Sequence, residues 1–319
     1  MTCQKSRGQA VSELKERHPE VSLESLCRLF GYTRQAYWKS RTSSIVDAMD
    51  DTALLHEVRE IRRELPRLGV RKLQVLLYQR GHDVGRDRLF DLLREAGMLV
   101  SRRRFRARTT DSRHWMRKWA NLIRDVVPVC MNQVWVSDIT YVEIKAVNRS
   151  YWMYLSLITD AYTHEIVGYA LHDTLDTAGP LRALEMAIGK FPAGTLSGLI
   201  HHSDRGAQYC SKEYVSVLQK NGIRVSMTEN GDPYENAIAE RTNGILKTEW
   251  LYHEVLRGPV HAQKRIDEII YTYNHRRPHM SIGNLTPEEA RSMKGEAAKL
   301  WKNYFAMKHE SVKTALACQ

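Results

Sequence analysis

The order of strand-like and helix-like segments after residue 132 limits the folds open to this 319-residue chain more than any other feature. Residues 133–144, 151–159 and 164–172 are rich in β-branched and aromatic side chains and are separated by short turns, a pattern typical of three consecutive strands. The segments that follow are predicted to alternate: helix 178–190, strand 198–203, helix 211–221, strand 223–227 and helix 236–250. A meander followed by alternating helices and strands predicts an α/β domain with a mixed five-stranded sheet and flanking helices.

The first forty residues are predicted to form a helix-turn-helix unit, residues 1–42. Apolar residues keep helical spacing after Ser22, Gly31 then ends that helix, and Thr33 can cap another one. The helix after Thr33 carries polar residues that are suited to contacting DNA: Arg34, Gln35 and Lys39. An ordinary αα-hairpin without a DNA contact is the alternative interpretation.

A second helical unit is predicted over residues 52–98, after a linker at 43–51. It is expected to contain three helices, one ending at Leu65, one over 70–80 and one over 86–96. Because this unit also places basic residues at its helix starts, it resembles a second helix-turn-helix, though less clearly than the first.

An Arg-rich connector, residues 99–120, is predicted to join the helical units to the α/β part. We expect its guanidinium groups to follow the DNA backbone, because they match the geometry of phosphate. A solvated charged linker is the alternative. The residues concerned are Arg102, Arg103, Arg104, Arg106 and Arg108.

The distribution of charge separates the two parts of the chain. Residues 1–119 hold 26 Lys and Arg against 15 Asp and Glu, whereas residues 120–319 hold 22 of each, so the whole net charge of +11 lies in the first part. This asymmetry predicts a nucleic-acid-binding part joined to a charge-balanced part. No apolar run approaches the ~20 residues of a membrane span, and the N-terminus lacks the pattern of a secretory signal. The five cysteines share no ligand-like spacing, so we expect reduced thiols in a cytoplasmic protein.

Three carboxylates stand in unusual contexts. Asp138 interrupts an apolar strand, Asp204 directly follows a buried strand, and Glu240 lies in a helix that begins near Asn236. In this topology the two strands are neighbours and the helix crosses their ends, so the three acids are expected to converge. Because close carboxylates repel one another, their convergence predicts divalent metal, Mg²⁺ or Mn²⁺, and two such ions can promote an in-line phosphoryl displacement.

Two other groups of residues compete for a role at this site. Asp160 ends a strand of the same sheet, and we interpret it as a turn residue. His201 and His202 are adjacent on a strand, so their side chains point to opposite faces and cannot easily bind one ion. We expect His202 to be packed, with a role beside the metal ligands as the alternative.

Four motifs carry a resemblance to a known family. Residues 135–140 (WVSDIT), 202–206 (HSDRG) and 236–249 (NAIAERTNGILKTE) resemble the three signatures of DDE transposases, and the thirty-five residues between Asp204 and Glu240 match the spacing of retroviral integrases. Residues 273–287 (YNHRRPHMSIGNLTP) are similar to the C-terminal signature of the second-frame (orfB) transposase of the IS-three type of bacterial insertion sequence. The resemblance covers nearly the whole chain. It implies a ribonuclease-H-like catalytic core over residues 128–258, followed by a helical extension over 259–319, in which a helix is expected at 287–305.

The resemblance also implies roles for individual residues. Asp138, Asp204 and Glu240 would bind two catalytic metal ions, and Lys247 would contact DNA near the cleaved end. Asn236, Glu240 and Lys247 are separated by one and then two helical turns, so they share one helix face. We expect Asn236 to act at the site, with a helix N-cap as the alternative. The basic loop at Arg276 and Arg277 is a further expected DNA contact.

The sequence thus predicts a DNA transposase that binds the ends of its element and catalyses metal-dependent cleavage and strand transfer. Its expected partners are double-stranded DNA and further copies of itself, and a first-frame (orfA) protein is another candidate; its expected location is the bacterial cytoplasm, at the nucleoid. A helix-turn-helix regulator, or a competitor of the fused transposase without activity of its own, is the alternative. A zinc-bearing retroviral-type integrase is disfavoured, because the N-terminal His and Cys residues lack a paired arrangement.

Overall fold

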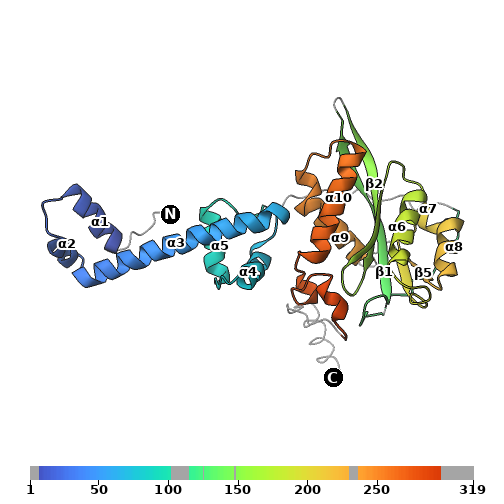
Figure 1. Ribbon diagram of the computed structural model, residues 1–319, viewed down its shortest axis with the longest axis horizontal. Coiled ribbons are helices and arrows are strands. Elements are labelled where there is room, and N and C mark those ends of the chain that lie inside the picture. Colours follow the sequence, from blue (N-terminus) through green and yellow to red (C-terminus); the bar gives the residue numbers. More distant parts are fainter. Residues whose placement is uncertain (1–6, 102–114, 125, 147–148, 230–235, 296–319) are drawn as a thin grey trace, which may run out of the picture. The chain divides into compact units, whose positions relative to one another are not determined.

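The computed structural model describes residues 7–101, 115–124, 126–146, 149–229 and 236–295 (Figure 1). The chain divides into two compact units, one formed by residues 1–61 and 76–99 and the other by residues 62–75 and 100–319. Among the described residues, no helix combines the length and the apolar character that crossing a membrane requires.

The N-terminal unit begins with the predicted helix-turn-helix arrangement: α1 (Arg7–Arg17), α2 (Leu23–Leu29) and α3 (Arg34–Glu64). The Ser22 hydroxyl accepts a hydrogen bond from the backbone N–H of Ser25, and the Thr33 hydroxyl accepts one from Ala36, so both predicted caps are confirmed. Gly31 takes the left-handed conformation (φ 59°) between the two helices, which a residue with a side chain adopts only at a cost. The small core of this arrangement consists of Val11, Leu26, Cys27 and Tyr37.

The predicted linker at residues 43–51 is wrong, because this segment lies inside α3. Neither Gly nor Pro occurs between Arg34 and Glu64, so nothing in the sequence stops the helix, and its polar composition alone does not break it. The helix ends just before Pro66, as the restricted backbone before a proline predicts. The next two helices, α4 (Val70–Gln79) and α5 (Arg86–Glu95), lie where they were expected.

The α/β part contains the predicted five-stranded mixed sheet. Its strands are β1 (Val134–Lys145), β2 (Ser150–Asp160), β3 (Ile166–His172), β4 (Ile200–Ser203) and β5 (Arg224–Met227). They are ordered β3-β2-β1-β4-β5; β2 is antiparallel to both β1 and β3, and β4 is parallel to both β1 and β5. This order confirms the expected ribonuclease-H-like core.

Helices cover both faces of this sheet (Figure 1). On one side lie α6 (Ala178–Gly189), α7 (Ala207–Cys210) and α8 (Lys212–Lys220), and on the other lie α9 (Ala237–Glu249) and α10 (Gly258–His275). Helix α6 packs so closely on β3 that a Cβ at Gly168 would come within 2.1 Å of the Ala183 carbonyl oxygen, so only glycine fits there. The core on that side includes Trp135, Ile158, Val167, Leu184 and Leu218.

The segment after α10 contains two short 3₁₀ turns, Met280–Ile282 and Glu289–Ser292, which follow an earlier 3₁₀ turn at Leu251–His253. The helix expected at 287–305 is therefore wrong for residues 287–295, and its remainder lies outside the described residues. The chain leaves helical geometry after Ser292: Met293 is extended, and the backbone N–H of Gly295, at φ 84°, donates to the Val129 carbonyl. Pairing with the core thus replaces the helical hydrogen bonds that the sequence pattern favours.

Candidate active site

Asp138 and Asp204 lie next to each other because β1 and β4 are parallel. Ser137 is paired with Ser203, so each aspartate is the residue that follows an aligned pair. Side chains alternate along a strand, and Val134 and Val136 pack with Ala239 of α9, so Asp138 points to the same side of the sheet. Both aspartates remain partly exposed to solvent.

The carboxylate of Asp138 is held by two hydrogen-bond donors. Its Oδ1 accepts from the backbone N–H of Ile139 (2.8 Å), and its Oδ2 accepts from the side-chain amide of Asn243 (2.7 Å). Burial, followed by the negative charge of Asp204, raises the pKa of Asp138 to about 7, and the charge of Glu240 adds to this effect. The two hydrogen bonds favour the charged carboxylate and lower its pKa, but they do not outweigh burial and the neighbouring acids.

Helix α9 brings the other predicted residues toward β1. Asn236 occupies the N-cap position of α9, as the alternative had it, but its side chain makes no capping bond. Its amide donates to the Ser137 carbonyl instead (3.2 Å). Lys247 is half-buried, and desolvation lowers its pKa while the charge of Asp138 raises it. The Lys247 ammonium therefore interacts electrostatically with the Asp138 carboxylate, to which Asn243 is also bound.

Glu240 lies at the margin of this arrangement. Its side chain is exposed, and partial desolvation raises its pKa. Within the described part of the chain, its carboxylate forms no hydrogen bond or ion pair. The position of Glu240 therefore depends on the position of α9 alone.

Asn243 is the residue of this site that sequence reasoning missed. It follows Glu240 by three residues and precedes Lys247 by four, which places it on the same helix face. Helical spacing alone could have identified Asn243 as a site residue, although it could not identify Asp138 as its partner.

The donor chemistry of the site fits a hard divalent cation, which prefers carboxylate and amide oxygens. The negative charges of Asp138 and Asp204 repel each other, and the side-chain oxygen of Asn243 is buried without a hydrogen-bond partner in the described residues. No group of three or more His, Cys, Asp or Glu side chains among the described residues is spaced to hold a metal, so the three acids do not form a preassembled metal site. Asp138, Asp204 and Glu240 are the residues that could hold it.

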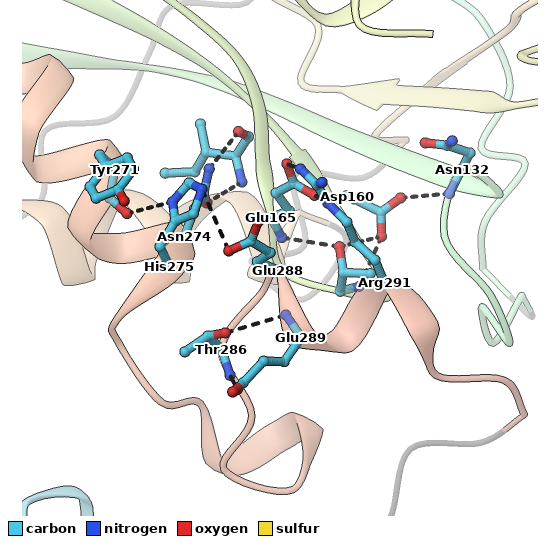
Figure 2. A network of polar contacts seen from close by, with 12 residues as sticks. Asn132, Asp160, Glu165, Tyr271, Asn274, His275, Thr286, Glu288, Glu289 and Arg291 are labelled. Atoms are coloured by element: carbon cyan, nitrogen blue, oxygen red, sulfur yellow. Dashed lines mark hydrogen bonds and ion pairs between the residues drawn. The ribbon is translucent and has the colours of Figure 1, made fainter. Parts of the chain in front are cut away.

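The two competing groups have structural roles. The Asp160 carboxylate accepts a hydrogen bond from the backbone N–H of Asn132 (Figure 2). It also accepts hydrogen bonds from the backbone N–H groups of Tyr162 and Thr163 and from the Thr163 hydroxyl, as the interpretation of a turn residue requires. His201 lies 2.9 Å from the Tyr214 hydroxyl and His202 lies 2.8 Å from the Ser226 hydroxyl, and both rings are buried. Packing and hydrogen bonding account for both histidines, as expected for His202.

The predicted DNA contacts have different fates. Arg34, Gln35 and Lys39 are exposed at the start of α3, where they remain predictions. Arg276 is half exposed and pairs with Glu64 of the same compact unit. The predicted contacts Arg102, Arg103, Arg104, Arg106 and Arg108 lie outside the described residues.

The prediction for Arg277 is wrong. Its side chain is 1% exposed and forms a two-pronged ion pair with Glu249, through Nε (2.8 Å) and Nη2 (2.6 Å). A guanidinium that is buried and paired in this way cannot reach a phosphate on the surface. Its charge is balanced by Glu249 inside the protein.

Comparison with known proteins places the site in context. Two family models, both described as "Integrase core domain", match residues 128–233 and 221–287. The chain is 38% identical over 271 residues to "Insertion element IS600 uncharacterized 31 kDa protein" of Shigella sonnei, covering 82% of this chain and 96% of that protein. It is 31% identical to "Transposase for insertion sequence element IS629" of Shigella sonnei (76% and 80% covered), and 26% identical to "Transposase InsF for insertion sequence IS3A" of Escherichia coli (86% and 96% covered).

Proposed function

The chain belongs to the transposases of bacterial insertion sequences that carry an integrase core, and on this premise we propose that it cuts and joins DNA at the ends of its own element by metal-dependent chemistry. One observation carries the proposal: the parallel pairing of β1 and β4 brings Asp138 beside Asp204, under the helix that bears Glu240 and Lys247.

The proposed reaction consists of two in-line displacements at phosphorus. Water attacks a phosphodiester first and frees a 3′-hydroxyl, and that hydroxyl then attacks a second phosphodiester, so each step forms one P–O bond and breaks another. Asp138, Asp204 and Glu240 would hold two Mg²⁺ or Mn²⁺ ions. When bound, such ions supply the charge that activates the attacking oxygen and stabilises the leaving one.

The remaining residues of the site orient these groups. Asn243 fixes one oxygen of Asp138 through its amide, which leaves the carboxylate in a single orientation. Lys247 offers an ammonium group on the side of α9 that faces Asp138, where it would bind a DNA phosphate. The proposed reaction thus relies on positioning and charge, and it needs no covalent enzyme intermediate.

We propose double-stranded DNA as the partner of the N-terminal helices, with Arg34, Gln35 and Lys39 at the interface and the arginines at 102–108 along the backbone. The net charge of +11, all of it within residues 1–119, supports this assignment. Assembly of several copies on the element ends, a first-frame (orfA) protein as a further partner and a location at the bacterial nucleoid belong to the same proposal.

The test incubates the purified chain with labelled DNA of its element's ends and Mg²⁺. We expect nicked or joined products from the wild type, none from Asp138→Asn or Glu240→Gln, and normal amounts from Glu213→Gln, which alters an exposed acid on α8. Tight, salt-sensitive binding without any metal-dependent product from the wild type would instead identify a DNA-binding regulator.

A further inference from the structure

Helix α9 is attached to the protein at both ends, and only one attachment belongs to the site already described. Toward β1, Asn236 and Asn243 bond to Ser137 and Asp138. At the other end, Glu249 occupies the last turn of α9 and binds Arg277, which follows α10. This second attachment lies nine residues beyond Glu240, or about 13 Å along the helix axis.

The Glu249–Arg277 pair has features that helix stability does not explain. A negative side chain in the last turn of a helix is unfavourable with respect to the helix dipole. A buried ion pair is also no more stabilising than well-packed apolar side chains of similar volume. The pair fixes the orientation of the Glu249 carboxylate, because a guanidinium bound through two nitrogens allows only one.

Arg277 is itself fixed by its surroundings. Its Nη1 lies 3.1 Å from Nε2 of His279, and burial together with the charge of Arg277 lowers the pKa of His279 well below its usual range, so the ring is a neutral acceptor. The His279 ring stacks on His164 (centroids 5.9 Å apart) and meets the edge of Tyr273 (4.8 Å). Arg277 is thus held rigidly between α10 and the β2–β3 turn.

The same segment is bound to the sheet next to this cluster. The side chain of Asn274 donates to the carbonyl of Ile166 and accepts from its N–H, both at 3.0 Å, so it pairs with β3 as another strand would (Figure 2). The four residues Tyr273, Asn274, Arg277 and His279 are all buried. Segment 273–279, which begins the C-terminal motif, therefore makes most of its contacts inside the protein.

We propose that Arg277 is a positioning residue for the active site: by holding Glu249 it fixes the rotation and axial position of α9, and with them the place of Glu240. The inference rests on the proposed function. Glu240 has no bond of its own among the described residues, so a small shift of α9 moves it directly. A misplacement of ~1 Å in such a site costs ~100-fold in rate.

The experiment compares Arg277→Lys and Glu249→Gln with Arg291→Lys. The last variant is the control, because Arg291 forms another two-pronged pair, with Glu165 of the β2–β3 turn and not with a residue of α9 (2.7 and 2.6 Å; Figure 2). We expect Arg277→Lys and Glu249→Gln to lower the single-turnover rate at saturating DNA by about tenfold or more, with Kd within about twofold and the salt dependence of binding unchanged. Arg291→Lys is expected to keep the wild-type rate.

Hydrogen exchange of the α9 amides supplies a readout that does not depend on activity. We expect exchange over residues 237–249 to accelerate about fivefold or more in Arg277→Lys and to stay unchanged in Arg291→Lys. If Arg277→Lys does not fold, the double variant Arg277→Met with Glu249→Leu removes both buried charges and is expected to show the same loss of rate.

Three outcomes would overturn the inference. Arg277 would be a DNA contact if Arg277→Lys lowered the affinity for DNA and left the rate at saturating DNA unchanged. The salt dependence of binding would then fall by the equivalent of about one phosphate contact. An equal loss of rate in Arg291→Lys would show that the effect comes from a general loss of protein stability and not from the position of α9. Unchanged exchange in α9 would refute the positioning role even if the wild type yielded no product, a result that would count separately against the proposed function.

Discussion

Two aspartates on adjacent strands of one sheet, Asp138 on β1 and Asp160 at the end of β2, show how the same side chain serves opposite purposes. Asp160 is fully buried, and its carboxylate accepts four hydrogen bonds from one turn and from Asn132. Asp138 is partly exposed, accepts two, and lies beside the like charge of Asp204. Burial raises the pKa of both, but only at Asp138 does a neighbouring acid add to the effect.

The difference separates a carboxylate bound by the protein's own donors from one that is available to a ligand. Where both carboxylate oxygens are bound by the protein's own donors in a fully buried place, the charge stabilises a turn and is closed to a ligand. Where donors are few and another acid is close, the protein keeps an electrostatic cost that a bound cation would remove. The comparison therefore predicts that substitutions at the two positions have opposite consequences.

The largest effect is expected from Asp138→Asn. Removing this charge should lower the rate of DNA cleavage by about 1000-fold or more, or ~4 kcal/mol in activation free energy, because a proposed metal ligand is lost. The metal-free variant should unfold at the same or a higher denaturant concentration than the wild type, since repulsion with Asp204 is relieved. A gel assay and a urea titration check both parts, and a clear loss of stability would contradict the assignment.

Asp160→Asn should show the reverse. An amide cannot accept all four hydrogen bonds from the turn and Asn132, and it directs its own N–H groups toward other donors, so we expect a loss of about 2–3 kcal/mol in the free energy of unfolding. The rate per folded molecule should remain at the wild-type level, once the folded fraction has been measured by circular dichroism. A lost rate in fully folded protein would place Asp160 in the active site.

Asn243→Ala sharpens the comparison by removing one of the two donors at Asp138. The pKa of Asp138 should rise further, so protons compete better with metal, and the Mg²⁺ concentration for half-maximal activity at pH 7 should increase about tenfold. The increase should shrink at pH 8.5, where Asp138 is ionised in either protein. Asn221→Ala, which removes an amide bound to the Val217 carbonyl at the end of α8, is the control and should behave as the wild type.

The smallest effect concerns pH and stability in the metal-free protein. The folded-state pKa of Asp138 is raised, so the folded protein binds this proton more tightly than the unfolded chain. Stability from this group is present below the ordinary pKa near 4 and is lost as pH rises toward 7. Between pH 6 and 8 the wild type should therefore lose about 1.3 kcal/mol more than Asp138→Asn, and parallel curves in urea titrations would contradict the raised pKa.

Several predictions from the sequence agree with the structure for reasons that are local. The caps at Ser22 and Thr33 depend on a side chain and an N–H three residues away, and the strands depend on runs of β-branched residues. The membership in a transposase family is confirmed as well, because its motifs are short and keep their order.

Arg277 and Arg276 are adjacent basic residues in one motif, and only packing distinguishes them. One is buried against Glu249, whereas the other is half exposed. Nothing in the local pattern gives this difference, since it depends on where the end of α9 meets the end of α10. Asn243 and the length of α3, by contrast, could have been predicted from local sequence, the first from helical spacing and the second from the absence of Gly and Pro between Arg34 and Glu64.

The sequence by itself determined the order of the elements, the family and the positions of the three acids, because these follow from periodicity and from motifs that are contiguous in the chain. Only the tertiary structure decided which polar side chains are satisfied inside the protein and which remain available. The side chains of Asp160 and Arg277 are bound by partners inside the protein, whereas those of Asp138 and Glu240 remain available to a ligand. The physical reason is that burial and hydrogen bonding at these positions depend on residues tens of positions away, such as Glu249 for Arg277, which only the folded chain brings together.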